Sequence, residues 1–451
     1  MSQIPVDDAR IAPGQVWEWQ VILSAEGKPA RLGYNQIRHT AAARRARAAG
    51  GRLVFTIAAT FDLPGPNDLD ALDAALRRFV RRHEALRARY NGLTCAVLDP
   101  DDVELERTTG PRLVTSAQVR AYLRRRFRQV DTLDGPWLAL GAITRDDSTT
   151  VYLAFDHLVA DTMSAIVAVT DIAMDYEGHE PAEPGDGYLT FSQEQHRQHS
   201  RLRADDPRLR VWEEFSAGEG GLFPPFPLDL GVPPGQVFPP VNKSVTLMNA
   251  RETGALEARC HESGAGLSLG VLAAVAVSQR NAGGPGIHRN LMLVNERKAG
   301  RATGSVGWFV NVLPITVPVP PGSNSTDMLT RTRQAYERAR DHNEIHYLRA
   351  WDLLDPNGDH PSSYWPYPVN LFSYLDVRNT PCEPNIHHVT SASDGILSWF
   401  VRDTTGLHLN VIHARTTQAK CVTTGLIQSL RATLFAMKRN GPLTHDQAVK
   451  V

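Results

Sequence analysis

The segment VYLAFDHLVADTMSAIV, residues 151–167, brings two carboxylates and an imidazole to the end of an apolar run. Asp156 and His157 are adjacent, and Asp161 follows four residues after the histidine. An imidazole has a reference pKa of about 6.5, so His157 could exchange a proton near neutral pH. Asp161 could cap the helix that follows or pair with a buried arginine. His157 is therefore a candidate proton-transfer group, and the alternative is a hydrogen-bonded structural histidine at a strand end.

The element that positions these residues is a predicted strand over residues 150–157. Side chains alternate between the two faces of a strand, so Asp156 is expected to point away from His157 and to be structural. Both faces are mostly apolar, which predicts an interior strand: Val151, Leu153 and Phe155 share the face of His157, and Tyr152 and Ala154 share that of Asp156.

The rest of the chain alternates between helical and strand patterns, which predicts an α/β (α+β) fold of two lobes with similar composition. Glycine and proline accumulate over residues 218–240, the best candidate for a linker. Helices are predicted at 67–86, 115–130, 251–263, 267–280, 325–343 and 417–438, and strands at 52–63, 137–143, 290–297, 307–319, 367–376, 396–402 and 405–413. Two histidine-containing segments, 385–395 and 342–346, are predicted to be a loop and a solvated helix end.

Composition excludes several classes of function. The 451 residues are 42% hydrophobic, which fits two or three domains, and the formal net charge of −1 provides no basic field for nucleic acid. The four cysteines are far apart, so we expect no metal site, no disulfide framework and a reducing, cytoplasmic location. The N-terminus does not resemble a signal peptide, and no apolar run approaches the roughly 20 residues of a membrane helix.

Several motifs in order resemble the condensation-domain superfamily, which includes the condensation enzymes of nonribosomal peptide synthesis and is related to chloramphenicol acetyltransferase. The segment 156–162 is similar to the HHxxxDG motif, of which HxxxD is the minimal form. The further matches are LGYNQIRH (32–39), RRHEALRARY (81–90), LDGPWLAL (133–140) and VGWFVNVLPI (306–315).

The resemblance implies two chloramphenicol-acetyltransferase-like lobes in a V-shaped pseudo-dimer, with the active site in a tunnel at their interface. We expect the N-terminal lobe over residues 1–185 and the C-terminal lobe over 186–451. It also implies a thioester donor on the phosphopantetheine arm of a carrier protein, and no permanently bound cofactor.

Carried over by position, the resemblance makes His157 the catalytic histidine and Asp161 the structural aspartate. Arg297 lies ten residues before Gly307, where the family tends to have an arginine, and the resemblance makes it the candidate partner of Asp161. A buried carboxylate needs such a partner, because an unpaired buried charge is very costly. Asn311, in the later motif, could help to position substrate, or it could be a satisfied buried strand amide.

The sequence departs from the family motif at two positions. Asp156 replaces the first histidine. Thr162 replaces the glycine, where a β-branched residue is strained if the backbone needs a positive φ. If the glycine instead gives room to the pantetheine arm, Thr162 narrows the tunnel and is a candidate for substrate positioning. Asp156 is expected to be structural, and substrate positioning is its alternative role.

We therefore expect a free-standing condensation enzyme of specialised metabolism. It would join an acyl or aminoacyl thioester, delivered in trans by an acyl or peptidyl carrier protein, to an amine or alcohol acceptor. The alternatives are a CoA-dependent acyltransferase of the same superfamily and a catalytically silent docking module.

Overall fold

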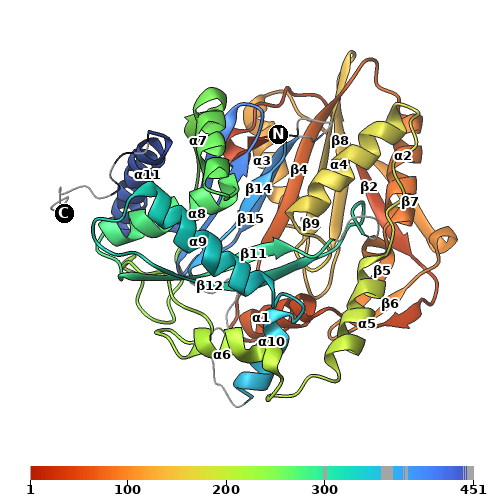
Figure 1. Ribbon diagram of the computed structural model, residues 1–451. Helices are drawn as coiled ribbons and strands as arrows, with labels where there is room; N and C mark the ends of the chain where they lie inside the picture. Colours follow the sequence, from red (N-terminus) through yellow and green to blue (C-terminus); the bar gives the residue numbers. More distant parts are fainter. Residues whose placement is uncertain are drawn as a thin grey trace.

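The computed structural model of the protein describes residues 2–297, 302–356, 369–378, 380, 384–439, 441 and 443 (Figure 1). Helices and strands alternate along the chain, as the sequence pattern predicts. The helices are α1 (Tyr34–Ala48), α2 (Leu69–Arg82), α3 (Ser116–Phe127), α4 (Thr162–Tyr176), α5 (Tyr188–His199), α6 (Arg210–Ser216), α7 (Ala250–Glu262), α8 (Leu267–Asn281), α9 (Ser325–Arg340), α10 (Tyr347–Leu354) and α11 (Thr417–Lys438).

The first half of the chain builds most of a seven-stranded sheet. The strand order is β1 (Ser2–Gln3), β15 (Asn385–Thr390), β4 (Phe55–Pro64), β9 (Ser148–Asp156), β8 (Leu138–Thr144), β2 (Gln15–Leu23) and β7 (Val103–Arg112). A smaller sheet contains β3 (Lys28–Ala30), β6 (Thr94–Val97) and β5 (Ala88–Asn91).

Strand β9 is interior, as its two apolar faces predict. Leu153 and Phe155 pack into the core that α2 and α4 cover, and Tyr152 packs with α3 on the opposite face. Helix α2 follows the predicted period, and the Asp68 carboxylate caps it by accepting hydrogen bonds from the amides of residues 70 and 71. Both layers therefore hold the end of β9, where His157 follows, in place.

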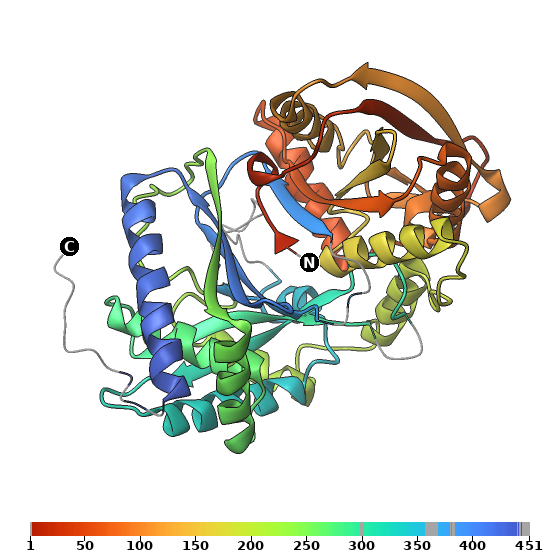
Figure 2. The ribbon, with the colours of Figure 1, turned by 90° about the horizontal axis from the view of Figure 1, so that it is seen from above.

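The second half of the chain forms two further sheets. One has the order β10 (Pro240–Asn249), β17 (Gly406–Ala414), β16 (Ile396–Arg402) and β14 (Tyr374–Asp376), and the other β12 (Val310–Pro318), β11 (Ile287–Asn295) and β13 (Leu371–Phe372). Helices α7, α8, α9 and α11 pack around a second core (Figures 1 and 2).

The loop predicted over residues 385–395 is wrong for residues 385–390, which form strand β15, whereas residues 391–395 belong to no helix or strand. This strand lies in the sheet of the first half, where it pairs with β1 on one side and β4 on the other (Figure 2). The two adjacent histidines interrupt the apolar alternation that would have indicated a strand. His387 contacts the carbonyl oxygen of Ile4 through Nδ1 at 2.8 Å and the hydroxyl of Thr60 through Nε2 at 3.1 Å.

The solvated helix end predicted at residues 342–346 is also wrong for its last histidine. His346 is buried, and its ring stacks on Tyr34 at a centroid distance of 5.1 Å. It caps α10 instead of ending α9. The proline- and glycine-rich segment 218–240 connects α6 to β10 and is irregular, but Phe223 within it packs edge-on against Trp351.

Within the described part of the chain, no single helix combines the length and apolarity needed to span a bilayer. Helices α7 and α8 meet that criterion only when taken together, and they are bent by 96° at their junction.

Candidate active site

His157 lies at the end of β9, between two aromatic rings. Its backbone amide donates a hydrogen bond to the carbonyl oxygen of Phe55 at 3.0 Å, which continues the pairing of β9 with β4. The Phe55 ring stacks on the imidazole at a centroid distance of 4.9 Å, and the Trp308 ring stacks at 3.8 Å. Burial among these groups lowers the pKa of His157 to about 4, so the imidazole is neutral at pH 7.

Asp161 and Arg297 form the ion pair that the sequence predicts. Arg297 Nη1 lies 2.7 Å from Asp161 Oδ2, and Nη2 lies 2.9 Å from Oδ1, a bidentate arrangement. Only 2% of the arginine side chain and 4% of the aspartate side chain are exposed, so the charges compensate each other away from water.

The same carboxylate also organises the backbone around it. Asp161 caps α4 by accepting a hydrogen bond from the amide of Ser164 at 2.8 Å, and it accepts another from the amide of Phe309 at 3.0 Å. Arg297 donates to the carbonyl oxygens of Ser305 and Gly307. The pair thus joins the turn after His157 to the segment that carries Trp308.

Asp156 is buried at the end of β9, directly before His157. Its carboxylate accepts hydrogen bonds from the Thr132 hydroxyl at 2.9 Å and from the backbone amide of Leu158 at 2.9 Å, and it contacts His39 Nε2 at 3.2 Å. Asp156 does not line the cavity that contains His157. Its contacts hold the turn that carries His157.

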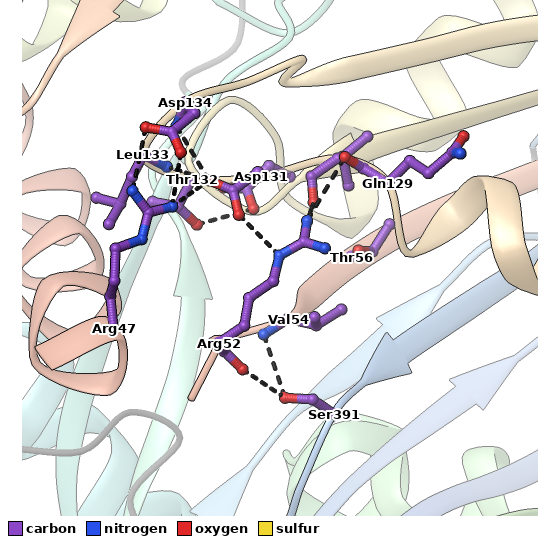
Figure 3. A network of polar contacts seen from close by, with 12 residues as sticks. Arg47, Arg52, Val54, Thr56, Gln129, Asp131, Thr132, Leu133, Asp134 and Ser391 are labelled. Atoms are coloured by element: carbon purple, nitrogen blue, oxygen red, sulfur yellow. Dashed lines mark hydrogen bonds and ion pairs between the residues drawn. The ribbon is translucent and has the colours of Figure 1, made fainter. Parts of the chain in front are cut away.

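A second network supports Thr132 from outside (Figure 3). Asp131 accepts hydrogen bonds from the side chains of Arg47, at the end of α1, and Arg52, before β4. The Ser391 hydroxyl donates to the carbonyl oxygen of Arg52 and accepts from the amide of Val54, which fixes the end of β15 beside β4. Segments that are far apart in the sequence are thereby held together next to the site.

The cavity that contains His157 has about 1420 Å³ of empty space, part of which is open to solvent, and both halves of the chain line it. Most of the lining is apolar. Its aliphatic and aromatic members are Phe55, Met163, Leu293, Val294, Trp308, Val310, Val312, Tyr347, Leu371, Tyr374, Leu375, Ile396, Leu397 and Trp399.

Thr162 is the first residue of α4, directly after the Asp161 cap. Its backbone is helical, so a threonine here carries none of the strain that a positive φ would impose. The side chain lines the cavity, and its hydroxyl contacts His388 Nε2 at 3.2 Å.

Asn311 lies on β12 but does not line the cavity. Its amide nitrogen donates to the carbonyl oxygens of Asn343 and Ile345, and its oxygen accepts from the amides of Val312 and Tyr347. With these four contacts the side chain is satisfied within the fold. The geometry corresponds to the buried strand amide that was the alternative to substrate positioning.

Sequence reasoning missed three residues of this region. Trp308 and His39 lie within the motifs at 306–315 and 32–39, so those motifs offered a signal for them. His388 offered none, because the histidine pair at 387–388 lacks the motif spacing. Among the described residues, no group of three histidine, cysteine, aspartate or glutamate side chains is arranged to hold a metal ion.

Comparison with known families gives one match that spans most of the chain. The model of the family described as Condensation domain matches residues 49–362. This range includes the HxxxD segment, Arg297 and Trp308.

Curated relatives are acyltransferases by name. PapA3 of Mycobacterium tuberculosis, "Acyltransferase PapA3", is 26% identical over 367 residues, which are 77% of this chain and 76% of that protein. The trehalose-2-sulfate acyltransferase PapA2 of Mycobacterium bovis is 28% identical over 331 residues, which are 69% of each chain.

Solved structures share the fold. The PapA2 acyl transferase aligns with a TM-score of 0.84 at 23% identity, over 97% of this chain and all of that one (100%). The condensation domain of the monacolin K polyketide synthase MokA aligns with a TM-score of 0.75 at 15% identity, over 93% of this chain and 100% of that one. The X-domain from teicoplanin biosynthesis aligns with a TM-score of 0.70 at 18% identity, over 94% and 98%.

Proposed function

Because this chain belongs to the Condensation domain family and is an acyltransferase, we propose that it transfers an acyl group from a thioester to a hydroxyl, forming an ester. The observation that carries the proposal is the neutral imidazole of His157 at the wall of an apolar cavity. An amine is already nucleophilic, whereas a hydroxyl needs its proton removed as it attacks, which is the task a neutral imidazole performs.

The cavity supports an aliphatic acyl group. Its lining is mostly apolar, so transfer of a hydrocarbon chain from water into the cavity is favourable by about 0.8 kcal/mol for each buried CH₂ group. We place the acyl chain along the residues of β11 and β16 that line the cavity and the thioester carbonyl next to His157. As part of this proposal, the two lobes form a V and the cavity is a section of a tunnel between them.

The reaction needs one proton carrier and no covalent enzyme intermediate. The acceptor oxygen attacks the thioester carbonyl carbon while His157 takes the hydroxyl proton, which leaves a tetrahedral oxyanion. The intermediate collapses, the carbon–sulfur bond breaks, and the imidazolium returns the proton to the leaving thiolate. The products are an ester and a free thiol, and His157 is neutral again.

The roles of the other residues follow from their contacts. Asp161 and Arg297 keep the turn after His157 in one conformation and supply no proton, since each is held by the other and by backbone groups. Asp156 supports the same turn from behind. These are positioning residues, and His157 is the catalytic residue.

The donor is proposed to be the phosphopantetheine thioester of an acyl or peptidyl carrier protein, with acyl-CoA as the alternative. Both present the same thioester on the same arm, so the cavity does not separate them. The acceptor is proposed to be an alcohol because the names of the relatives describe acylation of a sulfated trehalose.

The test is a matrix of donors and acceptors analysed by mass spectrometry. Decanoyl-CoA and a decanoyl carrier protein are each combined with alcohols and with amines, using the wild-type enzyme and the His157→Ala variant. We expect ester formation by the wild type and a loss of at least about 100-fold in the variant, the usual contribution of a general base. Equal product in both would refute the role of His157, and amide as the main product would refute ester formation.

One structural neighbour motivates a second candidate of another class. The X-domain from teicoplanin biosynthesis is also described in a complex with OxyB. A silent docking role is disfavoured for this chain because the HxxxD residues and Arg297 are present and paired. Absence of turnover with every donor in the matrix would favour it.

A further inference from the structure

His388 brings a second imidazole to the cavity, from a part of the chain far from the HxxxD segment. It lies on β15 directly opposite Ile57 of β4, which in turn lies opposite Phe155 of β9. Directly paired residues share one face of a sheet, and so do residues two apart on a strand. His388 and His157 are therefore on the same face, with their Cα atoms about 12 Å apart, across two strand spacings and two residues along the strand.

Thr162 holds this imidazole. The threonine hydroxyl and His388 Nε2 are 3.2 Å apart, and both residues line the cavity. The backbone of β15 is fixed as well, because the side-chain amide of Asn242 donates to the carbonyl oxygen of His388 at 3.0 Å. The ring also packs against Trp399 at a centroid distance of 4.6 Å. The pair is thus a fixed polar feature within a mostly apolar wall.

The hydrogen bond between Thr162 and His388 leaves other hydrogen-bond donors and acceptors of the two side chains unused. If the hydroxyl donates to Nε2, its oxygen can still accept, and Nδ1 carries a proton. If Nε2 donates instead, the hydroxyl proton is free to bind another acceptor. Nδ1 is itself buried and has no hydrogen-bond partner among the described residues. In either state the pair can bind one more uncharged polar group.

We propose that Thr162 and His388 form a recognition site for a second hydroxyl of the acceptor, so that the enzyme selects polyols over simple alcohols. The inference rests on the proposed ester-forming function and deepens it. An aliphatic acyl chain cannot form hydrogen bonds with this pair. An acceptor with two hydroxyls can place one at His157 and the other at Thr162. Threonine in place of the motif glycine then adds a specificity-determining hydroxyl to the cavity.

The pair is suited to a neutral group. Burial lowers the pKa of His388 to about 3, with the neighbouring His157 as the next cause, so the ring carries no charge at pH 7. An uncharged imidazole and a hydroxyl form ordinary hydrogen bonds with an alcohol. They offer no charge to a sulfate or phosphate, which sets this site apart from one built on arginine.

The experiment compares octanediols of different hydroxyl spacing with 1-octanol as acceptors, using decanoyl-CoA and the decanoyl carrier protein as donors. A neutral hydrogen bond contributes up to about 1.4 kcal/mol, so we expect kcat/KM about tenfold higher for at least one diol than for 1-octanol. Thr162→Val keeps the shape of the side chain and removes its hydroxyl, and it should bring this ratio to about one. His388→Phe should do the same, and Thr162→Ser should restore the ratio to within about twofold of the wild type.

His387→Gln is the matched control, because His387 lies on the same strand and contacts Ile4 and Thr60 instead of Thr162. Its diol preference should equal that of the wild type. Thermal melts show whether each variant is folded, and Thr162→Val provides the test if His388→Phe does not fold.

The inference is overturned if the wild type esterifies 1-octanol and every diol equally well, or if folded Thr162→Val keeps the preference. If the wild type forms no ester with any acceptor, the proposed function itself fails and the inference fails with it. The two failures are therefore distinguishable.

Discussion

At the scale of single residues, the protonation state of His157 decides what the site can do. The imidazole lies between Phe55 and Trp308, and these rings remove the water that would stabilise its charged form. In the proposed reaction, a base that is neutral throughout the physiological range is available to every acceptor that enters. A lowered pKa also makes His157 a weaker base. Proton transfer to it is still favourable, because the attacking hydroxyl becomes more acidic as its bond to the carbonyl carbon forms.

The pH dependence of activity should report this state. In the proposed reaction the neutral form acts as base, so we expect activity to be complete above the pKa of His157 and to be lost as the pH falls through about 4. We expect kcat/KM to be flat from pH 8 to about pH 5, where a histidine with an ordinary pKa of about 6.5 would already have lost most of its activity. Initial rates after a brief pH jump would measure this, and an acid limb centred near 6.5 would contradict it.

Asp156 should matter for stability more than for chemistry. Asp156→Ala removes a buried acceptor from Thr132, from the amide of Leu158 and from His39. Hydrogen bonds to a charged group contribute about 1.5–3 kcal/mol each, and water that enters the space left by the carboxylate replaces some of them. We therefore expect a net loss of about 3 kcal/mol in the free energy of unfolding. Urea denaturation measures it.

The control for Asp156 is Asp134→Ala, since 71% of the Asp134 side chain is exposed in its contact with Arg47. That change should cost less than about 0.5 kcal/mol. Equal losses in the two variants would show that the Asp156 network contributes no special stability.

At the scale of elements, the ion pair between Asp161 and Arg297 joins the start of α4 to the segment between β11 and β12. These two elements come from different halves of the chain, and each contributes to the cavity wall. The position of His157 relative to Trp308 therefore depends on a contact between elements, not on either element alone.

Breaking this pair should destabilise the protein strongly. Arg297→Ala leaves the Asp161 carboxylate buried without its partner, so we expect a loss of about 3–5 kcal/mol. Arg297→Lys should recover only part of it, because an ammonium group cannot form the bidentate contact. The His157 base is intact in both variants, so the activity that remains per folded molecule should exceed that of His157→Ala.

The matched control is Lys28→Ala, which breaks an ion pair with Asp99 in which the side chains are 80% and 61% exposed. An exposed pair contributes at most about 1 kcal/mol. A loss in Arg297→Ala as small as that of Lys28→Ala, measured in the same urea series, would contradict the proposed role of the buried pair.

At the scale of the whole molecule, buried histidines make stability depend on pH. Burial lowers the pKa of His288 and His387 to about 4 and that of His346 to about 3. The unfolded chain takes up protons on these groups below about pH 6.5, whereas the folded protein does not, so stability is complete above that pH and decreases as the pH falls.

Each such histidine should remove up to about 1.4 kcal/mol of stability for every pH unit between about 6.5 and its folded pKa. We therefore expect the urea midpoint to fall steeply from pH 7 to pH 5. Burial raises the pKa of two carboxyl groups, that of Asp394 to about 6 and that of Asp352 above its usual value, and these two groups oppose the trend. His288→Leu should make the decline shallower by one proton, and His179→Ala, at a side chain 68% exposed, should leave it unchanged. Equal slopes in all three proteins would contradict this account.

The sequence by itself determined the local features of this protein. The two apolar faces of residues 150–157 predicted an interior strand, and β9 packs into a core on each face, because a strand that is apolar on both faces must be covered on both. The cost of an unpaired buried charge predicted that Asp161 needs a cation, and the family motifs pointed to Arg297. The helices and most strands of the second half also follow from their periodicity.

Only the tertiary structure decided which distant segments meet. Residues 385–390 became a strand of the first sheet because β1 and β4 pair with both of its edges, and no local pattern encodes a partner more than 300 residues away. That pairing brought His388 to Thr162. Asn311 became a structural amide because the backbone at residues 343–347 folds back onto it. Local periodicity fixes which way a side chain points, and long-range packing fixes what it meets.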